Sequence, residues 1–410
     1  MKAKLVGKIF SIQEQEIKPV LLLLVYSFFM GAAIALFYTS TTSLILNRFD
    51  STVLPFAYIS GGIIVYFLSE LNRIIQSKYK LSNVLLVNIG FLLVSTTIFI
   101  FINLVTGNKW MIFLLFVWVR VFTFIHGVSF WAIAVKIFDI RQGKRLFGLI
   151  SSGEVLAAIF SQFSIPLLLN VIKTEDLLYI GIVEIAVSLF FIAYLRNNLK
   201  NKLDETTIED SSVKSDESED KSNQKKSKNK FSIFFENKYN TYIFFLALLP
   251  MFGMYYADFI FFTQSKVVFS DKEVLTQFLA IFLGFSAILE LTVKSLLTGR
   301  LVSKYGLKIG LLALPSMLLL GFGLPSVIGT IAGQGILFFS FISAGRLFMR
   351  IIRVGVNDPV FQILFQPINK NIRTKFQNQV EGQPKALGNI LAGIVLIILT
   401  SLSFVNILHI

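Results

Sequence analysis

The sequence predicts an all-α protein with many membrane-spanning helices, and three observations support this fold class. Of the 410 residues, 55% are hydrophobic and only 15% are charged, whereas soluble domains carry about 25% charged residues. The apolar residues gather in runs of about 20, the length that crosses the hydrocarbon core of a bilayer as a helix. The charged residues lie mostly between these runs. The lipid bilayer is therefore the first expected partner.

Eleven apolar runs are long enough to be spans. The first run, from Val20, lacks a small-residue cleavage site, so we expect it to stay in the protein and not to be removed as a signal peptide. Gly107 and Asn108 break the chain between the third and fourth runs, and Pro325 lies at the end of the ninth. The runs cover residues 19–46, 53–71, 82–105, 110–137, 146–171, 177–195, 241–262, 275–297, 307–326, 331–354 and 381–402.

The net charge of +14 is better explained by membrane topology than by nucleic-acid binding. A basic soluble face could bind nucleic acid, but here most basic residues lie just outside apolar runs. Cytoplasmic loops of membrane proteins carry an excess of Lys and Arg. Every second loop is basic, and the N-terminal segment belongs to the basic set. This predicts a multi-pass protein of the bacterial inner (plasma) membrane with a cytoplasmic N-terminus and no nucleic-acid partner.

The residue inventory also argues against an enzyme. The chain has no cysteine and only two histidines, so disulfides, Cys-ligated metals and a His-rich metal site are not expected. It contains no GxxxxGK[ST] phosphate loop, no HExxH and no GxSxG. We therefore expect no catalytic activity, no cofactor and no metal.

Residues 196–240 differ in composition from the rest of the chain. The first part, Asp204 to Asp220, is acidic and rich in Ser and Thr, and the second part, Lys221 to Lys230, is basic. Such a segment cannot bury enough apolar surface to fold, so it should be a disordered cytoplasmic linker; a lipid-binding role for its lysines is the alternative. The linker separates a predicted N-terminal six-helix bundle, 1–195, from a C-terminal bundle, 241–410.

The two halves resemble each other at an offset of 224 to 228 residues. Two six-helix units repeated in parallel and joined by a cytoplasmic linker describe the major facilitator architecture. The stretch GRLVSKYGLK, 299–308, also resembles a short cytoplasmic-loop motif of that superfamily. The matched segments are 33–39 with 257–263, Arg120-Val121-Phe122 with Arg346-Leu347-Phe348, and Phe138, Arg145 and Glu154 with Phe365, Arg373 and Glu381.

The repeat predicts that a twelfth helix begins near residue 404. The C-terminal bundle should therefore hold five helices and the start of a sixth, with the twelfth helix largely missing from this chain. We expect the chain to be a shortened form of a longer protein. A protein with eleven spans is the alternative.

Ionisable residues inside a bilayer are costly and usually functional. Arg120 and Arg346 lie at matched positions in the fourth and tenth runs, and Glu154 and Glu381 at matched positions in the fifth and eleventh. In a major facilitator fold these helices line or flank the central cavity. Arginine grips carboxylate or phosphate, so both arginines are candidate binding residues for an anionic substrate. Both glutamates are candidates for coupling or gating; structural ion pairs are the alternative for all four.

Further intramembrane polar residues complete the candidate set. Asp258 in the seventh run matches Ile34 in the repeat and is a candidate proton or cation site. Glu290 and Lys294 are four residues apart, so they share a helix face and can neutralise each other. Two tyrosines are candidate binding residues: Tyr38, which begins a run of hydroxyl side chains, and Tyr256, which precedes Asp258 by two residues.

Two segments carry motifs of a known family. The first is DIRQGKRLFGLISSGE, 139–154, which resembles the loop and fifth helix of the bacterial ATP/ADP antiporter (nucleotide transporter) family and its uncharacterised relatives. The second resembles the family's tenth-to-eleventh region and carries Asn357-Asp358-Pro359, Gln366-Pro367, Arg373, Lys375, Glu381-Gly382, Lys385, Leu387-Gly388 and Ala392-Gly393. The resemblance implies the transport of nucleotides or related anions.

The function expected from these observations is secondary active transport of an organic anion, with nucleotides as the candidates that the resemblance implies. Transport would proceed by alternating access. The rival hypothesis is a non-transporting membrane sensor or scaffold within a larger protein, with a fused or associated cytoplasmic regulatory domain. Some relatives of the nucleotide transporters carry such domains.

Overall fold

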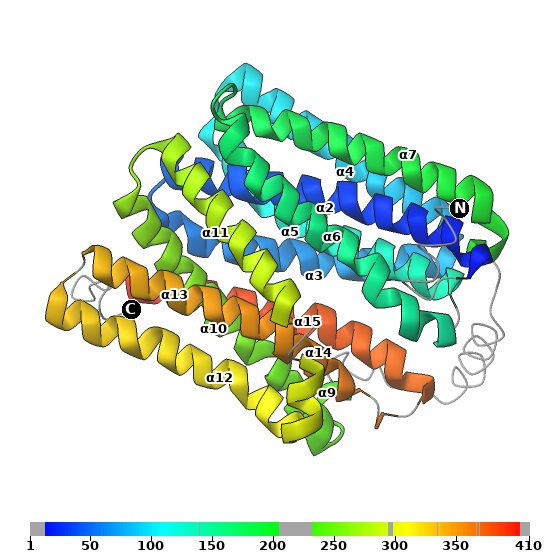
Figure 1. The fold of residues 1–410 in the computed structure, drawn as a ribbon. Helices are drawn as coiled ribbons and strands as arrows, with labels where there is room; N and C mark the ends of the chain where they lie inside the picture. The colour runs from blue at the N-terminus through cyan, green and yellow to red at the C-terminus, as the bar shows by residue number, and fades with distance from the viewer. Residues whose placement is uncertain are drawn as a thin grey trace.

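The computed structural model describes residues 13–138, 140–204, 232–293, 298–333, 335–365, 367–368 and 370–401. All regular structure in these ranges is helical (Figure 1). A bilayer offers no partner for backbone groups, and a helix satisfies them within one segment. The main helices are α2 (Glu14–Arg48), α3 (Leu54–Lys78), α4 (Leu81–Thr106), α5 (Lys109–Ile137), α6 (Ile140–Leu168), α7 (Leu177–Asp204), α10 (Lys238–Val268), α11 (Lys272–Thr292), α12 (Thr298–Ala332), α13 (Ile336–Ile352) and α15 (Lys370–Ser401).

These helices match the predicted spans in order, and the all-α polytopic fold class is confirmed. Ten helices in the described ranges are long and apolar enough to cross a membrane. The tenth predicted span, 331–354, is the exception, because α13 has only 17 residues. It continues through a π-helix, Arg353–Asn357, into α14, Asp358–Ile363. The predicted twelfth helix lies outside the described residues.

The edges of the predicted linker, 196–240, are helical where the sequence predicts disorder. Helix α7 runs on to Asp204, whose carboxylate accepts a hydrogen bond of 2.8 Å from the Ser82 hydroxyl in α4. Arg196 donates to the Asn83 side chain at 2.7 Å. These bonds hold the polar end of α7 against the start of α4. On the other side of the linker, α9 (Ser232–Phe235) precedes α10; residues 205–231 lie outside the described part of the chain.

The helices of the first half of the chain, up to residue 204, and of the second half, from residue 232, meet along two lines of contact. Figure 1 shows α2 to α7 towards the upper right of the view and α10 to α15 towards the lower left. Helix α3 packs along α15, and α6 packs along α11. Helix α2 is the most enclosed helix of the first half, because it packs against α5, α6 and α7.

Aromatic side chains fill the middle of the molecule. Phe37 of α2 stacks on Phe122 of α5 with ring centroids 5.1 Å apart. In the second half, Phe261 stacks on Phe282 at 4.7 Å. All four belong to one continuous apolar core that reaches from α2 into α10 and α11. The tyrosines of the polar site described below pack in the same core.

Close helix contacts depend on small residues, as is usual where helices pack in lipid. A Cβ atom on Gly388 of α15 would lie 2.7 Å from the Leu248 carbonyl oxygen of α10 and 2.8 Å from the Met251 side chain. A Cβ on Gly393 would lie 2.7 Å from the Pro55 carbonyl oxygen of α3. Helix α15 can therefore lie against both α10 and α3 only because these positions lack side chains.

We expect Gly388→Ala to destabilise the protein, because the added methyl group meets backbone that cannot yield. Overpacking of this kind costs about 1–3 kcal/mol. Gly90→Ala in α4 is the matched control, since a Cβ there meets nothing within 4 Å and alanine is the better helix former. Thermal unfolding of the purified full chain in detergent measures both variants. Equal melting temperatures for the two variants would contradict the close contact.

Candidate functional site

Polar residues from five helices meet between the two halves of the chain. We call this group the central polar cluster, and its members come from both halves. Arg120 and Arg346 lie on α5 and α13, which are equivalent helices in the sequence repeat. The cluster consists of Tyr38 (α2), Tyr58 (α3), Arg120 (α5), Tyr255 and Asp258 (α10) and Arg346 (α13).

Arg346 forms a buried ion pair with Asp258. Its Nε atom donates to Asp258 Oδ1 at 2.9 Å. The side chain of Arg346 is 3% exposed and that of Asp258 is 14% exposed. The Nη2 atom donates a longer bond, 3.5 Å, to the Tyr38 hydroxyl on α2. Arg346 therefore joins α13 to α10 within its own half and to α2 of the other half.

Three phenylalanine rings surround the Arg346 guanidinium. Its Cζ atom lies 4.5 Å, 5.0 Å and 5.6 Å from the centroids of Phe261, Phe262 and Phe282. The rings stabilise the cation through their faces. The Nη1 atom is buried and has no hydrogen-bond partner within the described structure. A buried donor without a partner costs about 1–3 kcal/mol, so Nη1 is a ready donor for an incoming acceptor.

Arg120 differs from Arg346 because no carboxylate is paired with it. Its guanidinium lies over the Tyr255 ring, with Cζ 5.0 Å from the centroid. Tyr38, Tyr58 and Asp258 are within electrostatic range. Within the ranges that the structure describes, Arg120 has neither a hydrogen bond nor an ion pair. Its Cγ would lie 3.3 Å from a Cβ on Gly61 of α3, so this glycine leaves room for the arginine.

The tyrosines connect the two arginines across the halves. Tyr58 of α3 packs on Tyr255 of α10 with ring centroids 4.8 Å apart. The Tyr58 hydroxyl is buried and, among the described residues, has no hydrogen-bond partner. Each arginine thus contacts a tyrosine of the opposite half: Arg120 contacts Tyr255, and Arg346 contacts Tyr38. The cluster offers two guanidinium groups and a free hydroxyl, which suits a carboxylate or phosphate ligand.

The structure brings four sequence-predicted site residues together. Arg120, Arg346, Tyr38 and Asp258 all belong to the central polar cluster. The sequence assigns Asp258 to coupling and Arg346 to binding as separate roles, but the two side chains form one ion pair. Any change in the charge of Asp258 therefore acts on Arg346 directly.

Tyr256, the fourth predicted binding residue, lies outside the cluster. It packs against the apolar core, and its neighbour Tyr255 takes the position beside Arg120. Helix geometry explains the shift, because residues three apart share a face and residues two apart do not. Tyr255 lies three residues before Asp258, so this rule alone would have identified it. Tyr58 carried no comparable signal, because it lies in an ordinary apolar run of α3.

Glu154 lies next to a histidine. Its Oε2 atom is 3.6 Å from Nε2 of His126, whose Nδ1 lies 3.2 Å from the Tyr26 hydroxyl. A Cβ on Gly31 of α2 would lie 2.8 Å from the Glu154 Cα atom, so α2 and α6 cross closely at this level. The predicted equivalent, Glu381, lies on α15, and its side chain is outside the described structure.

Glu290 forms an ion pair with Arg350 of α13, Nε to Oε1. The sequence predicted Lys294 as its partner, four residues away on the same helix; Lys294 lies outside the described residues. Arg350 is one helical turn beyond Arg346, so the two ion pairs, Asp258–Arg346 and Glu290–Arg350, follow each other along α13. No group of three or more His, Cys, Asp or Glu residues that could hold a metal ion occurs in the described ranges.

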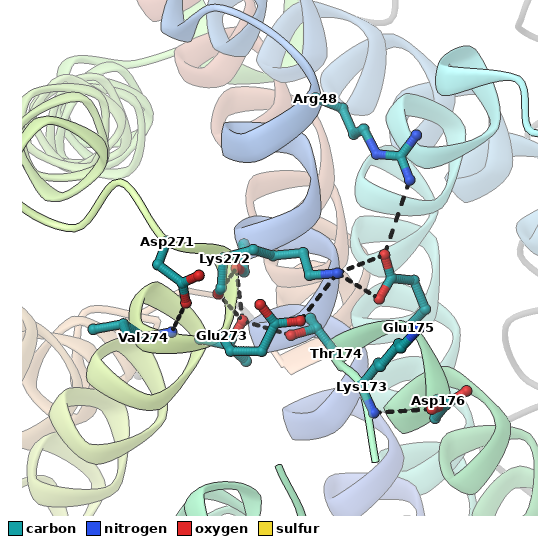
Figure 2. A network of polar contacts seen from close by, with 11 residues as sticks. Arg48, Lys173, Thr174, Glu175, Asp176, Asp271, Lys272, Glu273 and Val274 are labelled. Carbon is teal, nitrogen blue, oxygen red and sulfur yellow. Dashed lines mark hydrogen bonds and ion pairs between the residues drawn. The ribbon is translucent and has the colours of Figure 1, made fainter. Parts of the chain in front are cut away.

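A second polar group, which we call the end network, ties the halves together where α2 ends and α11 begins (Figure 2). Lys272 Nζ lies 2.9 Å and 3.0 Å from the two carboxylate oxygens of Glu175 in the α6–α7 connection. Arg48 approaches the same carboxylate at 3.9 Å. The Thr276 hydroxyl of α11 lies 2.7 Å from that of Ser43 in α2. The predicted topology places this end outside the cell.

Solved structures resemble the chain over most of its length, although no protein-family model and no curated protein sequence matches it. A mutant of the nucleoside transporter NupG is 15% identical, with a TM-score of 0.65, and the match covers 95% of this chain and 94% of that one. A POT family transporter in complex with 5-aminolevulinic acid is 12% identical, with a TM-score of 0.67 and coverage of 94% and 92%.

A D-xylose–proton symporter is also similar, at 12% identity and a TM-score of 0.62, with coverage of 94% of this chain and 90% of that one. These neighbours are transporters with the major facilitator fold, and each is named as a transporter, none as an enzyme. The chain therefore has the major facilitator fold that its internal repeat predicts.

We expect Asp258→Asn to destabilise the protein, because it leaves the buried Arg346 cation without its counter-ion. Removing one partner of a buried pair costs about 3–5 kcal/mol. Asp50→Asn is the control, because the Asp50 side chain is 93% exposed and exposed pairs contribute little. Differential scanning calorimetry of the purified full chain gives both values. A variant of Asp258 as stable as the control would mean that the ion pair is not structural.

We expect Lys272→Ala to loosen the end network, because it removes the cation that joins α11 to Glu175. Since the chain has no native cysteine, Ala280→Cys in the buried core below the network provides a single labelling site. Lys272→Ala should make the reaction of this cysteine with a membrane-impermeant maleimide roughly ten-fold faster. This rate change corresponds to a shift of about 1.4 kcal/mol in the opening equilibrium. Lys173→Ala, at the same end, should leave the rate unchanged. Equal rates in both variants would contradict this role of Lys272.

Proposed function

We propose that the protein is a secondary transporter that moves a small organic anion across the bacterial inner membrane by alternating access, with its N-terminus in the cytoplasm. The supporting observation is the charge of the central polar cluster. Two arginines and one aspartate give it one uncompensated positive charge, because Asp258 pairs with Arg346 and Arg120 has no acidic partner among the described residues. The Glu290–Arg350 pair beside it is neutral.

An uncompensated cation between helices is unfavourable and is a default functional site in a membrane protein. An anionic substrate would supply the missing counter-charge. It would reach two donors at once, the Arg120 guanidinium and the Nη1 atom of Arg346, which lacks an acceptor within the described structure. Guanidinium groups bind carboxylate and phosphate through two parallel hydrogen bonds. This selects anions over the neutral sugars and nucleosides named for some of the structural neighbours.

The aromatic side chains favour a substrate with a flat ring. Tyr58 and Tyr255 are buried against each other, and Tyr255 also lies beneath the Arg120 guanidinium. Because the two tyrosines belong to opposite halves, separation of the halves would uncover their rings for stacking. Nucleotides combine a ring with phosphate, and the resemblance of residues 139–154 to the nucleotide transporters points the same way. Nucleotides are therefore the first substrate class to test.

The cluster also explains how binding would drive the movement of the halves. Both arginines contact tyrosines of the opposite half, so an anion held between them bridges the two halves. A ligand shifts a conformational equilibrium only by binding one state better than the other. An anion that bridges the halves would bind better to the state in which both arginines reach it, and this difference in affinity would shift the equilibrium between the states. Coupling or gating is assigned to Asp258, which shares Arg346 with the substrate, and to Glu154, Glu381, Glu290 and Lys294.

We expect Arg120→Ala and Arg346→Ala to abolish uptake of organic anions into proteoliposomes without preventing membrane insertion. Loss of a charge-assisted hydrogen-bond pair is worth about 1.5–3 kcal/mol, or roughly a 10- to 100-fold loss of affinity. Arg120→Lys keeps the charge but loses the bidentate geometry, so it should retain part of the activity.

The control for this uptake experiment is Lys200→Ala, since Lys200 is exposed and forms no hydrogen bond or ion pair with the other residues that the structure describes. It should transport like the wild type. Transport at the wild-type rate by both arginine variants would refute the assignment of the central polar cluster. Failure of the wild type to transport any anion of a nucleotide, sugar phosphate and carboxylate panel would refute the proposed function.

A further inference from the structure

A cavity lies at the end of the molecule where α2 ends and α3 and α5 begin, apart from the central polar cluster. Its volume is about 670 Å³, within the range of small-molecule sites. We call it the end pocket. The lining residues that matter here are Arg48, Asp50, Lys109, Trp110, Phe113 and Lys266.

The end pocket carries a net positive charge. Three of these side chains are cationic and one is acidic, which leaves two positive charges. Lys266 is already engaged, because its Nζ donates to the Phe49 carbonyl oxygen at 2.8 Å and lies 3.6 Å from Asp50. Lys109 lies 5.3 Å from the Phe49 ring centroid and has no ion pair in the part of the chain that the structure describes. Arg48 is 46% exposed, with Glu175 at 3.9 Å.

Aromatic rings form one wall of the end pocket. Phe49 and Trp110 meet edge to face at 5.3 Å, and Trp110 and Phe113 meet at 5.7 Å. Trp110 remains 52% exposed, so its indole is available to a ligand. Two cations without full compensation beside an exposed indole suit one ligand chemistry: an anionic group attached to a flat ring.

Arg48 connects the end pocket to the end network. Its guanidinium lines the pocket and approaches the Glu175 carboxylate that Lys272 holds from the other half (Figure 2). An anion that binds Arg48 competes with Glu175 for it. Occupation of the pocket would then release Glu175 from Arg48 and leave this carboxylate to Lys272 alone.

We propose that the end pocket is an entry site that captures a ring-bearing organic anion before it reaches the central polar cluster. The proposal rests on the proposed transport of such anions and adds a second binding site on the path. It assigns capture to Arg48 and Lys109 and stacking to Trp110.

Trp110 supplies a direct readout of the end pocket. Trp118→Phe and Trp131→Phe together leave Trp110 as the single tryptophan of the chain. The purified full chain in nanodiscs of neutral lipid is titrated with AMP, with adenosine as the ring without charge and inorganic phosphate as the charge without ring. AMP should change the Trp110 fluorescence saturably. Adenosine and phosphate should each bind at least roughly ten-fold more weakly.

Variants then test the assignment. Arg48→Ala and Lys109→Ala should each weaken AMP binding by roughly ten-fold or more. Lys173→Ala, at the same end but not lining the cavity, should bind like the parent. Arg120→Ala should leave the Trp110 response intact. No saturable response to AMP, or equal affinity in all variants, would overturn the proposal.

An anionic lipid headgroup could supply the same phosphate chemistry. Nanodiscs of phosphatidylglycerol distinguish the two sources: if they abolish the AMP response, the pocket is a lipid site and the proposal fails. The outcome is separate from that of the proposed function. A missing Trp110 response with intact uptake refutes only the entry site. A clear Trp110 response without any uptake refutes transport and the pocket's role in entry, and leaves only anion binding at the end pocket.

Discussion

The arrangement at the centre of this protein depends on one buried ion pair, Arg346 with Asp258. A guanidinium that is almost fully buried must be neutralised, and Asp258 does this from the neighbouring helix of the same half. The geometry of the pair uses Nε of the arginine. The two terminal nitrogens are thereby aimed elsewhere, one at Tyr38 of the other half and one, Nη1, at no acceptor in the described structure. The ion pair thus holds the arginine in place and leaves its Nη1 atom available as a hydrogen-bond donor.

The same pair explains why the two halves are not equivalent. The sequence repeat matches Arg120 to Arg346, but it matches the hydrophobic Ile34 to Asp258. The first half therefore repeats the cation without its counter-ion, and Arg120 rests on the ring of Tyr255 instead. With an acidic residue at both positions, each arginine would have a counter-ion and the site would be neutral. Because the first half has Ile34 at this position, the site keeps a net positive charge. Selectivity for anions would follow from this asymmetry more than from any single contact.

The sequence predicted the helices well, because length and apolar composition are sufficient to recognise a span. It also singled out Arg120, Arg346 and Asp258, which the structure brings together, because charges inside apolar runs are rare and the repeat relates the two arginines. It failed where the answer depends on rotation about a helix axis, as with Tyr256 and Tyr255. Contacts between distant loops, such as Lys272 with Glu175, were not predictable, because neither residue lies in a run or repeat that would single it out.

The two polar groups between the halves lie at different levels of the molecule. The end network joins the halves at one end through the Lys272–Glu175 ion pair, and the central polar cluster holds the charge imbalance in the interior. The central claim is that Arg120 binds the substrate because it lacks a carboxylate. It is tested most directly by calorimetric titration of Ile34→Asp, with Ile34→Asn as the neutral control, using the organic anion that the wild type binds most tightly. The aspartate should lower the affinity by roughly ten-fold or more while the asparagine does not; equal affinity for the two variants would contradict the claim.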